Sequence, residues 1–113
     1  MNPNTILVDF DGVIHQYSRG WQNGDIYDPP MPGAFDALAA MERAGYRVVI
    51  FSTRDSAQIR KWMIENDGGA YPVTNIKEPA TAIIDDRGIH FISWPQAVTE
   101  LVARYPIHRR TRD

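Results

Sequence analysis

The sequence predicts an α/β protein with a three-layer, doubly wound (Rossmann-like) parallel sheet. Three short runs, at residues 5–10, 47–52 and 81–86, are almost continuously apolar, which is typical of parallel strands that are covered on both faces. Stretches with helical periodicity separate these runs, so strands and helices alternate as they do in right-handed βαβ units. Each run also ends in polar side chains, and the carboxyl ends of parallel strands form the ligand-binding edge of such sheets.

The first strand ends in the sequence Asp9-Phe10-Asp11-Gly12. Alternate residues of a strand share a face, so the carboxylates of Asp9 and Asp11 can converge on one point. Two carboxylates that lie close together repel unless a cation or a proton lies between them. Gly12 allows the backbone to turn sharply and to approach a ligand closely. The alternative interpretation of this motif is a strand end followed by an acidic turn.

The segment at residues 15–30 interrupts the alternation of strands and helices. Asn23-Gly24 lies near its middle and is a strong signal for a two-residue hairpin turn. We therefore expect a short β-flap directly after the acidic turn. The flap carries Trp21, which either stacks on a substrate or packs the flap.

Three helices are predicted from apolar residues at helical spacing. Pro32-Gly33 is expected at the start of the first helix and Gly45 at its end, while Asp55 or Ser56 caps the second. Residues 71–75 are a weaker candidate for a further strand. The apolar stripes of the helices are Phe35, Leu38 and Met41; Ile59, Trp62 and Met63; and Ala97, Leu101 and Tyr105.

The chain has 113 residues, enough for one compact domain with a single core. We expect residues 1–106 to form this domain and residues 107–113 to form a polar tail. Cysteine is absent and the net charge is −2, which argues against disulfides, thiol nucleophiles and a global attraction to nucleic acid or anionic membranes. No apolar run spans a membrane and no signal-peptide pattern is present, so we expect a cytoplasmic protein.

Polar residues follow the other strands as they follow the first. Ser52-Thr53-Arg54 ends the second strand, Asp85-Asp86-Arg87 ends the third, and Lys77 lies just before the third. Phosphoryl transfer through an aspartyl-phosphate needs this set of groups. One carboxylate attacks phosphorus, Mg²⁺ shields it, a hydroxyl and a lysine hold the phosphate, and a second acid protonates the leaving group.

The motifs resemble those of the haloacid dehalogenase (HAD) superfamily, in the family's order, over about residues 6–87 of the chain. Residues 7–13 resemble its first motif and residues 49–53 its second. Lys77 fits the third motif, and residues 83–86 resemble the acidic fourth. The first and fourth motifs are specific, whereas the second and third would be weak alone.

The resemblance implies an Mg²⁺-dependent phosphomonoester phosphatase. Asp9 would be the nucleophile and a metal ligand. Asp11 would be the general acid/base and would give its backbone carbonyl to Mg²⁺; the phosphatases of the family carry an acid there, and its dehalogenases do not. Ser52 would bind phosphate, and Lys77 would steady the phospho-aspartate.

The neighbouring residues complete the expected site. Asp85 and Asp86 would complete the metal site, with Asp86 as the direct ligand and Asp85 either a second ligand or an orienting group. Thr53 takes the place of Ser52 if the strand ends one residue later, and Arg54 either contacts substrate phosphate or forms a surface ion pair. The candidates for substrate binding are Gly12, Trp21, Thr53 and Arg54.

The short flap leaves no room for the cap domain of the family's larger members. An open site accepts a large phosphorylated substrate, such as a polynucleotide end or a phosphoprotein, or receives a lid from another subunit. Among phosphatase substrates, a nucleotide or a nucleic-acid end is favoured over a small metabolite. Asp85-Asp86-Arg87 also resembles the fourth motif of polynucleotide 3′-phosphatases. The rival hypothesis is a non-catalytic phosphate- or Mg²⁺-binding scaffold module. His15, His90 and His108 lack metal-ligand spacing, so no zinc site is expected.

Overall fold

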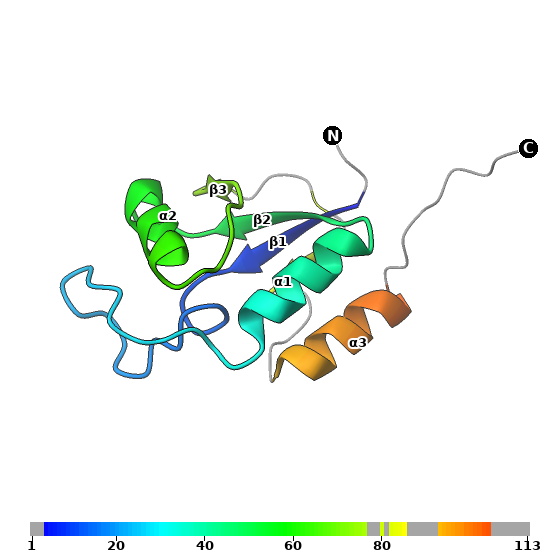
Figure 1. Ribbon diagram of the computed structural model, residues 1–113, viewed down its shortest axis with the longest axis horizontal. Helices are drawn as coiled ribbons and strands as arrows, with labels where there is room; N and C mark the ends of the chain where they lie inside the picture. The colour runs from blue at the N-terminus through cyan, green and yellow to red at the C-terminus, as the bar shows by residue number, and fades with distance from the viewer. Residues whose placement is uncertain (1–3, 77–79, 81, 86–92, 105–113) are drawn as a thin grey trace, which may run out of the picture.

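The computed structural model describes residues 4–76, 80, 82–85 and 93–104. This part of the chain forms an α/β domain with one parallel sheet and three helices (Figure 1). The strands are β1 (Thr5–Asp9), β2 (Arg47–Phe51), β3 (Val73–Thr74) and β4 (Ala82–Ile84). The helices are α1 (Ala34–Arg43), α2 (Ser56–Glu65) and α3 (Trp94–Arg104). The predicted parallel sheet with intervening helices is confirmed, while the expected tail at residues 107–113 lies outside the described residues.

Strand β1 lies inside the sheet, whose order is β3-β2-β1-β4. The chain moves outward from β1 through β2 to β3, and then returns to the opposite side of β1 to form β4. The order therefore reverses between β1 and β4. Open α/β sheets bind ligands beyond the carboxyl ends of the strands at such a switch point, and here β1 ends there in Asp9.

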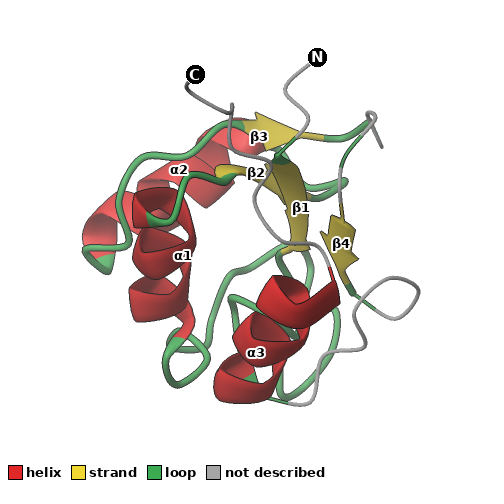
Figure 2. Ribbon diagram, turned by 90° about the vertical axis from the view of Figure 1, so that its right-hand side faces the viewer, coloured by secondary structure: helices red, strands yellow, loops and turns green. Residues whose placement is uncertain are grey.

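The described helices lie on one face of the sheet (Figure 2). Ile6 and Val8 of β1 belong to one apolar cluster together with buried residues of α1, α2 and α3. Leu7 and Val49 are also buried but lie outside this cluster, because successive residues of a strand point to opposite faces. The second helical layer expected of a doubly wound sheet is not among the described residues.

The ends of α1 and α2 follow the predicted capping chemistry. Gly45 has φ +106°, and its N–H donates to the Glu42 carbonyl at 3.0 Å, while the N–H of Tyr46 donates to the Met41 carbonyl at 3.1 Å. This pair of bonds ends a helix on a left-handed residue and turns the chain into β2. At the start of α2 the side chain of Asp55 is the N-cap.

The segment at residues 15–30 is an irregular loop, so the prediction of a β-flap is wrong. Asn23 and Gly24 have φ +52° and +84°, and the N–H of Asp25 donates to the Gln22 carbonyl at 2.9 Å. This is the tight turn that Asn-Gly favours. The residues on either side of the turn do not pair as strands, and an isolated bridge joins the two ends of the segment.

Side chains hold this loop in place of a strand ladder. The Tyr27 hydroxyl donates to the Gly20 carbonyl and accepts from the Arg19 N–H, both at 2.8 Å. The Asp28 carboxylate accepts from the Ser18 N–H at 2.6 Å. Side chains of this kind give loop backbone groups an alternative to ladder bonds, which is why the turn forms without its strands.

Candidate functional site at the carboxyl edge of the sheet

The register of the sheet brings three of the expected site residues to one edge. Asp9 is paired with Phe51, the residue before Ser52. Ile84 is paired with the residue before Asp9 and is followed directly by Asp85. The last residues of β1, β2 and β4 therefore lie side by side, as the sequence predicted. Ser52 and Asp85 are buried.

Two expected residues lie outside the described residues, namely Lys77 and Asp86. Their proposed roles on the phosphate and the metal stay predictions.

The turn after β1 brings the chain back onto Asp11. The Phe10 carbonyl accepts three successive backbone N–H groups, the last of them that of His15 at 3.0 Å. Gly12 has φ +80°, and a Cβ at this position would meet nothing within 4 Å. The space beside the Gly12 Cα is thus open, which suits close approach of a ligand, while the Gly12 N–H donates to the His15 carbonyl at 2.7 Å.

Both carboxylate oxygens of Asp11 accept hydrogen bonds. His15 Nδ1 lies 2.9 Å from Oδ1, and Arg54 Nε donates to Oδ2 at 2.8 Å. The side chains of His15 and Arg54 are 0% and 2% exposed, against 23% for Asp11. We name these three residues the Asp11 cluster. Charge-assisted bonds of this length are among the stronger hydrogen bonds in proteins, so the cluster holds the carboxylate in one orientation.

Arg54 connects this cluster to the loop at residues 15–30. Its Nη1 donates to the Gly24 carbonyl at 2.8 Å, and its guanidinium carbon lies 4.9 Å from the Trp21 ring centroid. Arg54 Nη2 is buried and has no hydrogen-bond partner among the described residues. Arg54 is thus a buried partner of the partly exposed Asp11, so the alternative of a surface ion pair is wrong, while contact of Arg54 with substrate phosphate stays a prediction.

Trp21 covers the guanidinium with one face and is itself 62% exposed. A cation at this distance from an aromatic ring is attracted to the ring face. Much of the indole surface thus remains accessible to another molecule.

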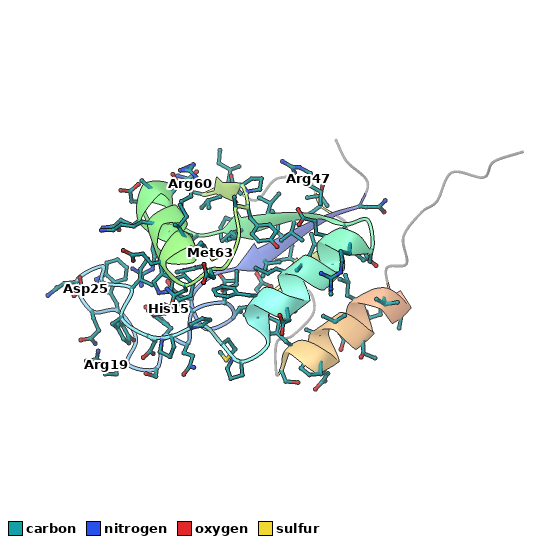
Figure 3. All side chains as sticks on the ribbon, in the orientation of Figure 1. His15, Arg19, Asp25, Arg47, Arg60 and Met63 are labelled. Atoms are coloured by element: carbon teal, nitrogen blue, oxygen red, sulfur yellow. The ribbon has the colours of Figure 1, made fainter. Side chains whose placement is uncertain are left out.

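His15 also contacts the site, a position that its sequence context, weighed only for a zinc ligand, did not predict. It lies at the base of the loop, below α2 in the view of Figure 3. Its Nε2 accepts from the Asp28 N–H at 3.0 Å, and the rings of Phe10 and Trp62 lie 5.6 and 5.7 Å away. The sequence signal that could have revealed it is its spacing of four residues from Asp11 across a glycine turn.

Beside the Asp11 cluster the edge opens into a cavity of about 410 Å³, which we name the Ser52 cavity. Ser52 Oγ accepts the Arg54 N–H at 3.1 Å, and Thr53 is exposed. The cavity reaches Ser56, the first residue of α2, where helical N–H groups favour anions. Its lining consists of Ser52, Thr53, Arg54, Asp55, Ser56, Val73, Thr74 and Asn75.

The oxygen atoms at the end of β1 suit a hard cation. Asp9 Oδ1 accepts the Phe10 N–H at 3.0 Å. The Asp11 backbone carbonyl accepts no hydrogen bond from a described residue, although its carboxylate is engaged in the cluster. These are the donor types that Mg²⁺ prefers. Across the described ranges, no group of three or more His, Asp or Glu side chains gathers around one point.

Comparisons of the chain with protein-family models, with curated proteins and with solved structures found no significant match. No helix in the described part of the chain combines the length and the apolar character needed to cross a membrane. The geometry of the carboxyl edge is therefore the basis for assigning a function.

Proposed function

We propose that the protein is an Mg²⁺-dependent phosphomonoester phosphatase of the HAD type that works through an aspartyl-phosphate. The observation that carries this proposal is the fixed carboxylate of Asp11, two residues after Asp9 at the end of β1. A nucleophile and an acid/base must both reach one phosphorus centre. A non-catalytic scaffold has no need of the complete set of expected site residues, which is Asp9, Asp11, Ser52, Lys77 and Asp86.

In the proposed mechanism the Asp9 carboxylate attacks phosphorus, and the bond from phosphorus to the leaving oxygen breaks. Asp11 gives its proton to that oxygen. Asp11 then takes a proton from water, which attacks the phospho-aspartate and releases phosphate and free Asp9. His15 and Arg54 each bond to a different Asp11 oxygen, and each oxygen has a further lone pair on which to carry the transferred proton.

The phosphate would bind beside Asp9 at the mouth of the Ser52 cavity. By this proposal the Ser52 hydroxyl binds the phosphate, Gly12 leaves room for its approach because it carries no side chain, and Thr53 lies at the rim. Lys77 would balance the charge of the transferring phosphoryl group.

Mg²⁺ would be held by the Asp9 carboxylate, the Asp11 backbone carbonyl and Asp86, with Asp85 as a further ligand or an orienting group. When bound, the cation shields the attacking carboxylate from the anionic phosphate. The oxygen-only character of these donors supports this assignment.

We also propose a doubly wound, three-layer fold. It is supported by Leu7 and Val49, which are buried although they lie outside the cluster with the described helices.

The exposed face of Trp21 favours a substrate with an aromatic base, such as a nucleotide or a polynucleotide end. A second subunit could supply a lid over the open edge, and the absence of cysteine suits the cytoplasm.

The decisive experiment is a phosphate-release screen of the purified protein. Its substrates are nucleotides, 3′- and 5′-phosphorylated oligonucleotides and sugar phosphates, each with Mg²⁺ and with EDTA. We expect Mg²⁺-dependent release that EDTA abolishes and added Mg²⁺ restores. Calcium should support the reaction poorly, because its larger and looser coordination misplaces the nucleophile. Full activity after thorough metal stripping, or no release from any substrate, would overturn the proposal.

A further inference from the structure

The imidazole of His15 is fully buried, with 0% of its side chain exposed. Burying a polar ring costs free energy unless its nitrogens are hydrogen-bonded. Both nitrogens of His15 are bonded, Nδ1 to Asp11 Oδ1 at 2.9 Å and Nε2 to the Asp28 N–H at 3.0 Å. The ring thus bridges the returning end of the loop to the acid at the end of β1.

The bond from Asp28 determines which nitrogen of His15 carries the proton. A backbone N–H can only donate, so Nε2 must accept, and in the neutral ring the proton then lies on Nδ1. Nδ1 is the atom that faces Asp11. The backbone of the loop therefore selects the tautomer that donates to the carboxylate. In histidine, the hydrogen-bond partner of one ring nitrogen determines whether the other nitrogen carries the proton.

The packing around the ring limits its freedom to reorient. Phe10 stacks on it, and Trp62 and Tyr27 meet it edge-on, with centroid distances of 5.6, 5.7 and 5.2 Å. An apolar ring could fill the same space. It would leave the Asp28 N–H without this acceptor and Asp11 Oδ1 without this donor, so packing alone does not account for an imidazole here.

We propose that His15 is a positioning residue, which holds Asp11 where it can protonate the leaving group. Arg54 fixes one carboxylate oxygen and His15 fixes the other, so rotation of the carboxylate away from the phosphate breaks at least one short bond. This inference rests on the proposed phosphatase function. His15 itself does not touch the reacting atoms.

Two variants of His15 separate its two hydrogen bonds. The amide nitrogen of His15→Asn takes the place of Nδ1 and keeps a donor to Asp11, but loses the acceptor for the Asp28 N–H. The amide of His15→Gln reaches the place of Nε2 and keeps that acceptor, but loses the donor to Asp11. Both variants lose the packed ring, so each is the control for the other.

The readout is kcat/KM with Mg²⁺ on an alkyl phosphate and on p-nitrophenyl phosphate. This ratio reports the transfer to Asp9, and the nitrophenolate leaves without needing a proton. For the alkyl phosphate we expect His15→Gln to lose on the order of 10²-fold, the size of a general-acid contribution, and His15→Asn to lose much less. For p-nitrophenyl phosphate both losses should be small and similar.

Equal losses on both substrates, or a His15→Asn variant as impaired as His15→Gln, would show that His15 only stabilises the fold. If neither variant folds, ¹⁵N NMR of the wild-type ring decides the matter, because a proton on Nε2 would overturn the proposed tautomer and with it the donor to Asp11. A wild-type protein that releases phosphate from neither substrate refutes the phosphatase function instead, and the positioning role falls with it.

Discussion

The Asp11 cluster and the Ser52 cavity are neighbours at the carboxyl edge of the sheet, yet the cluster is densely packed and the cavity is open. In the cluster, the His15 and Arg54 side chains are at most 2% exposed, and both Asp11 oxygens are bonded. The Ser52 cavity is about 410 Å³ of open space with polar walls. Under the proposed function, the contrast separates a chemical group that is fixed in advance from the space for a ligand beside it, as electrostatic preorganisation requires.

Arg54 joins the two regions. Its backbone N–H donates to Ser52 Oγ, while its side chain reaches Asp11 and the Gly24 carbonyl. Figure 3 shows Arg19 and Asp25 on the outer rim of the loop, away from the sheet. The loop is therefore attached to the site at its turn and through His15, while its rim faces outward.

The largest expected effect is that of Asp9→Asn, at the boundary between the two regions. The amide keeps the shape of the side chain but lacks the attacking charge, so turnover should fall on the order of 10⁴-fold or more. Because the substitution also relieves like-charge repulsion with Asp11, thermal stability without Mg²⁺ should be equal or higher. Phosphate release and thermal unfolding, measured on the same preparation, check both expectations. Near-wild-type turnover by a folded Asp9→Asn variant would refute the mechanism.

The next effect compares the loss of stability in the Asp11 cluster with the loss at the wall of the Ser52 cavity. Arg54→Met leaves the Asp11 carboxylate without its buried cation, a loss of about 3 kcal/mol for a largely buried pair. Ser52→Ala removes one hydrogen bond at the rim of the cavity, which is worth about 1 kcal/mol. Urea unfolding of both variants measures the difference. Equal stability losses would mean that the Asp11 cluster is no more tightly held than the cavity wall.

Trp21→Ala tests whether the substrate-binding surface extends from the Ser52 cavity to the loop at residues 15–30. Stacking of a base on an aromatic side chain contributes about 1–3 kcal/mol, so kcat/KM on a phosphorylated oligonucleotide should fall about 10-fold or more. On an alkyl phosphate, which has no ring to stack on the indole, the loss should be small, because remote contacts position the reacting group only where the substrate has them.

Trp21→Phe is the matched control, since it keeps an aromatic ring over Arg54 and should retain most of the oligonucleotide activity. An equal loss on both substrates would identify Trp21 as a packing residue of the loop. A small metabolite that the monomer processes with high efficiency would overturn the view of an open site for large substrates.

Sequence reasoning reached the parts of the structure that depend on local chemistry. Continuous apolar runs predicted β1, β2 and β4, although β4 is described only as Ala82–Ile84 and the expected strand at residues 71–75 is limited to Val73–Thr74. The positive φ angles at Asn23 and Gly24 also followed from local preference. The strands of the flap did not form, because side chains distant from the turn satisfy the loop backbone.

The contacts that define the site could not be predicted from the sequence, because they depend on side chains that lie far apart in the chain or on a third partner. Arg54 and Asp11 lie 43 residues apart, and no local pattern distinguishes a buried arginine from one in a surface ion pair. The contact of His15 with Asp11 is local in the chain, but the direction of its hydrogen bond depends on the Asp28 N–H, which donates to the other ring nitrogen. The arrangement of site residues at the strand ends was predictable because parallel strands share one carboxyl edge.

The smallest expected effect concerns the loop that joins the two regions. Hydrogen bonds from the Ser18 side chain and then its backbone lower the pKa of the Asp28 carboxyl from its ordinary value. A lowered pKa in the folded state stabilises the loop above the ordinary pKa, and this contribution is lost as the pH falls below about 4. Asp28→Asn keeps an oxygen acceptor for Ser18 but does not titrate. Tryptophan fluorescence, to which the loop residue Trp21 contributes, should therefore change more steeply between pH 7 and lower pH in the wild-type protein than in Asp28→Asn. Identical acid profiles for the two proteins would show that the Asp28 carboxylate does not help to hold the loop on the Asp11 cluster.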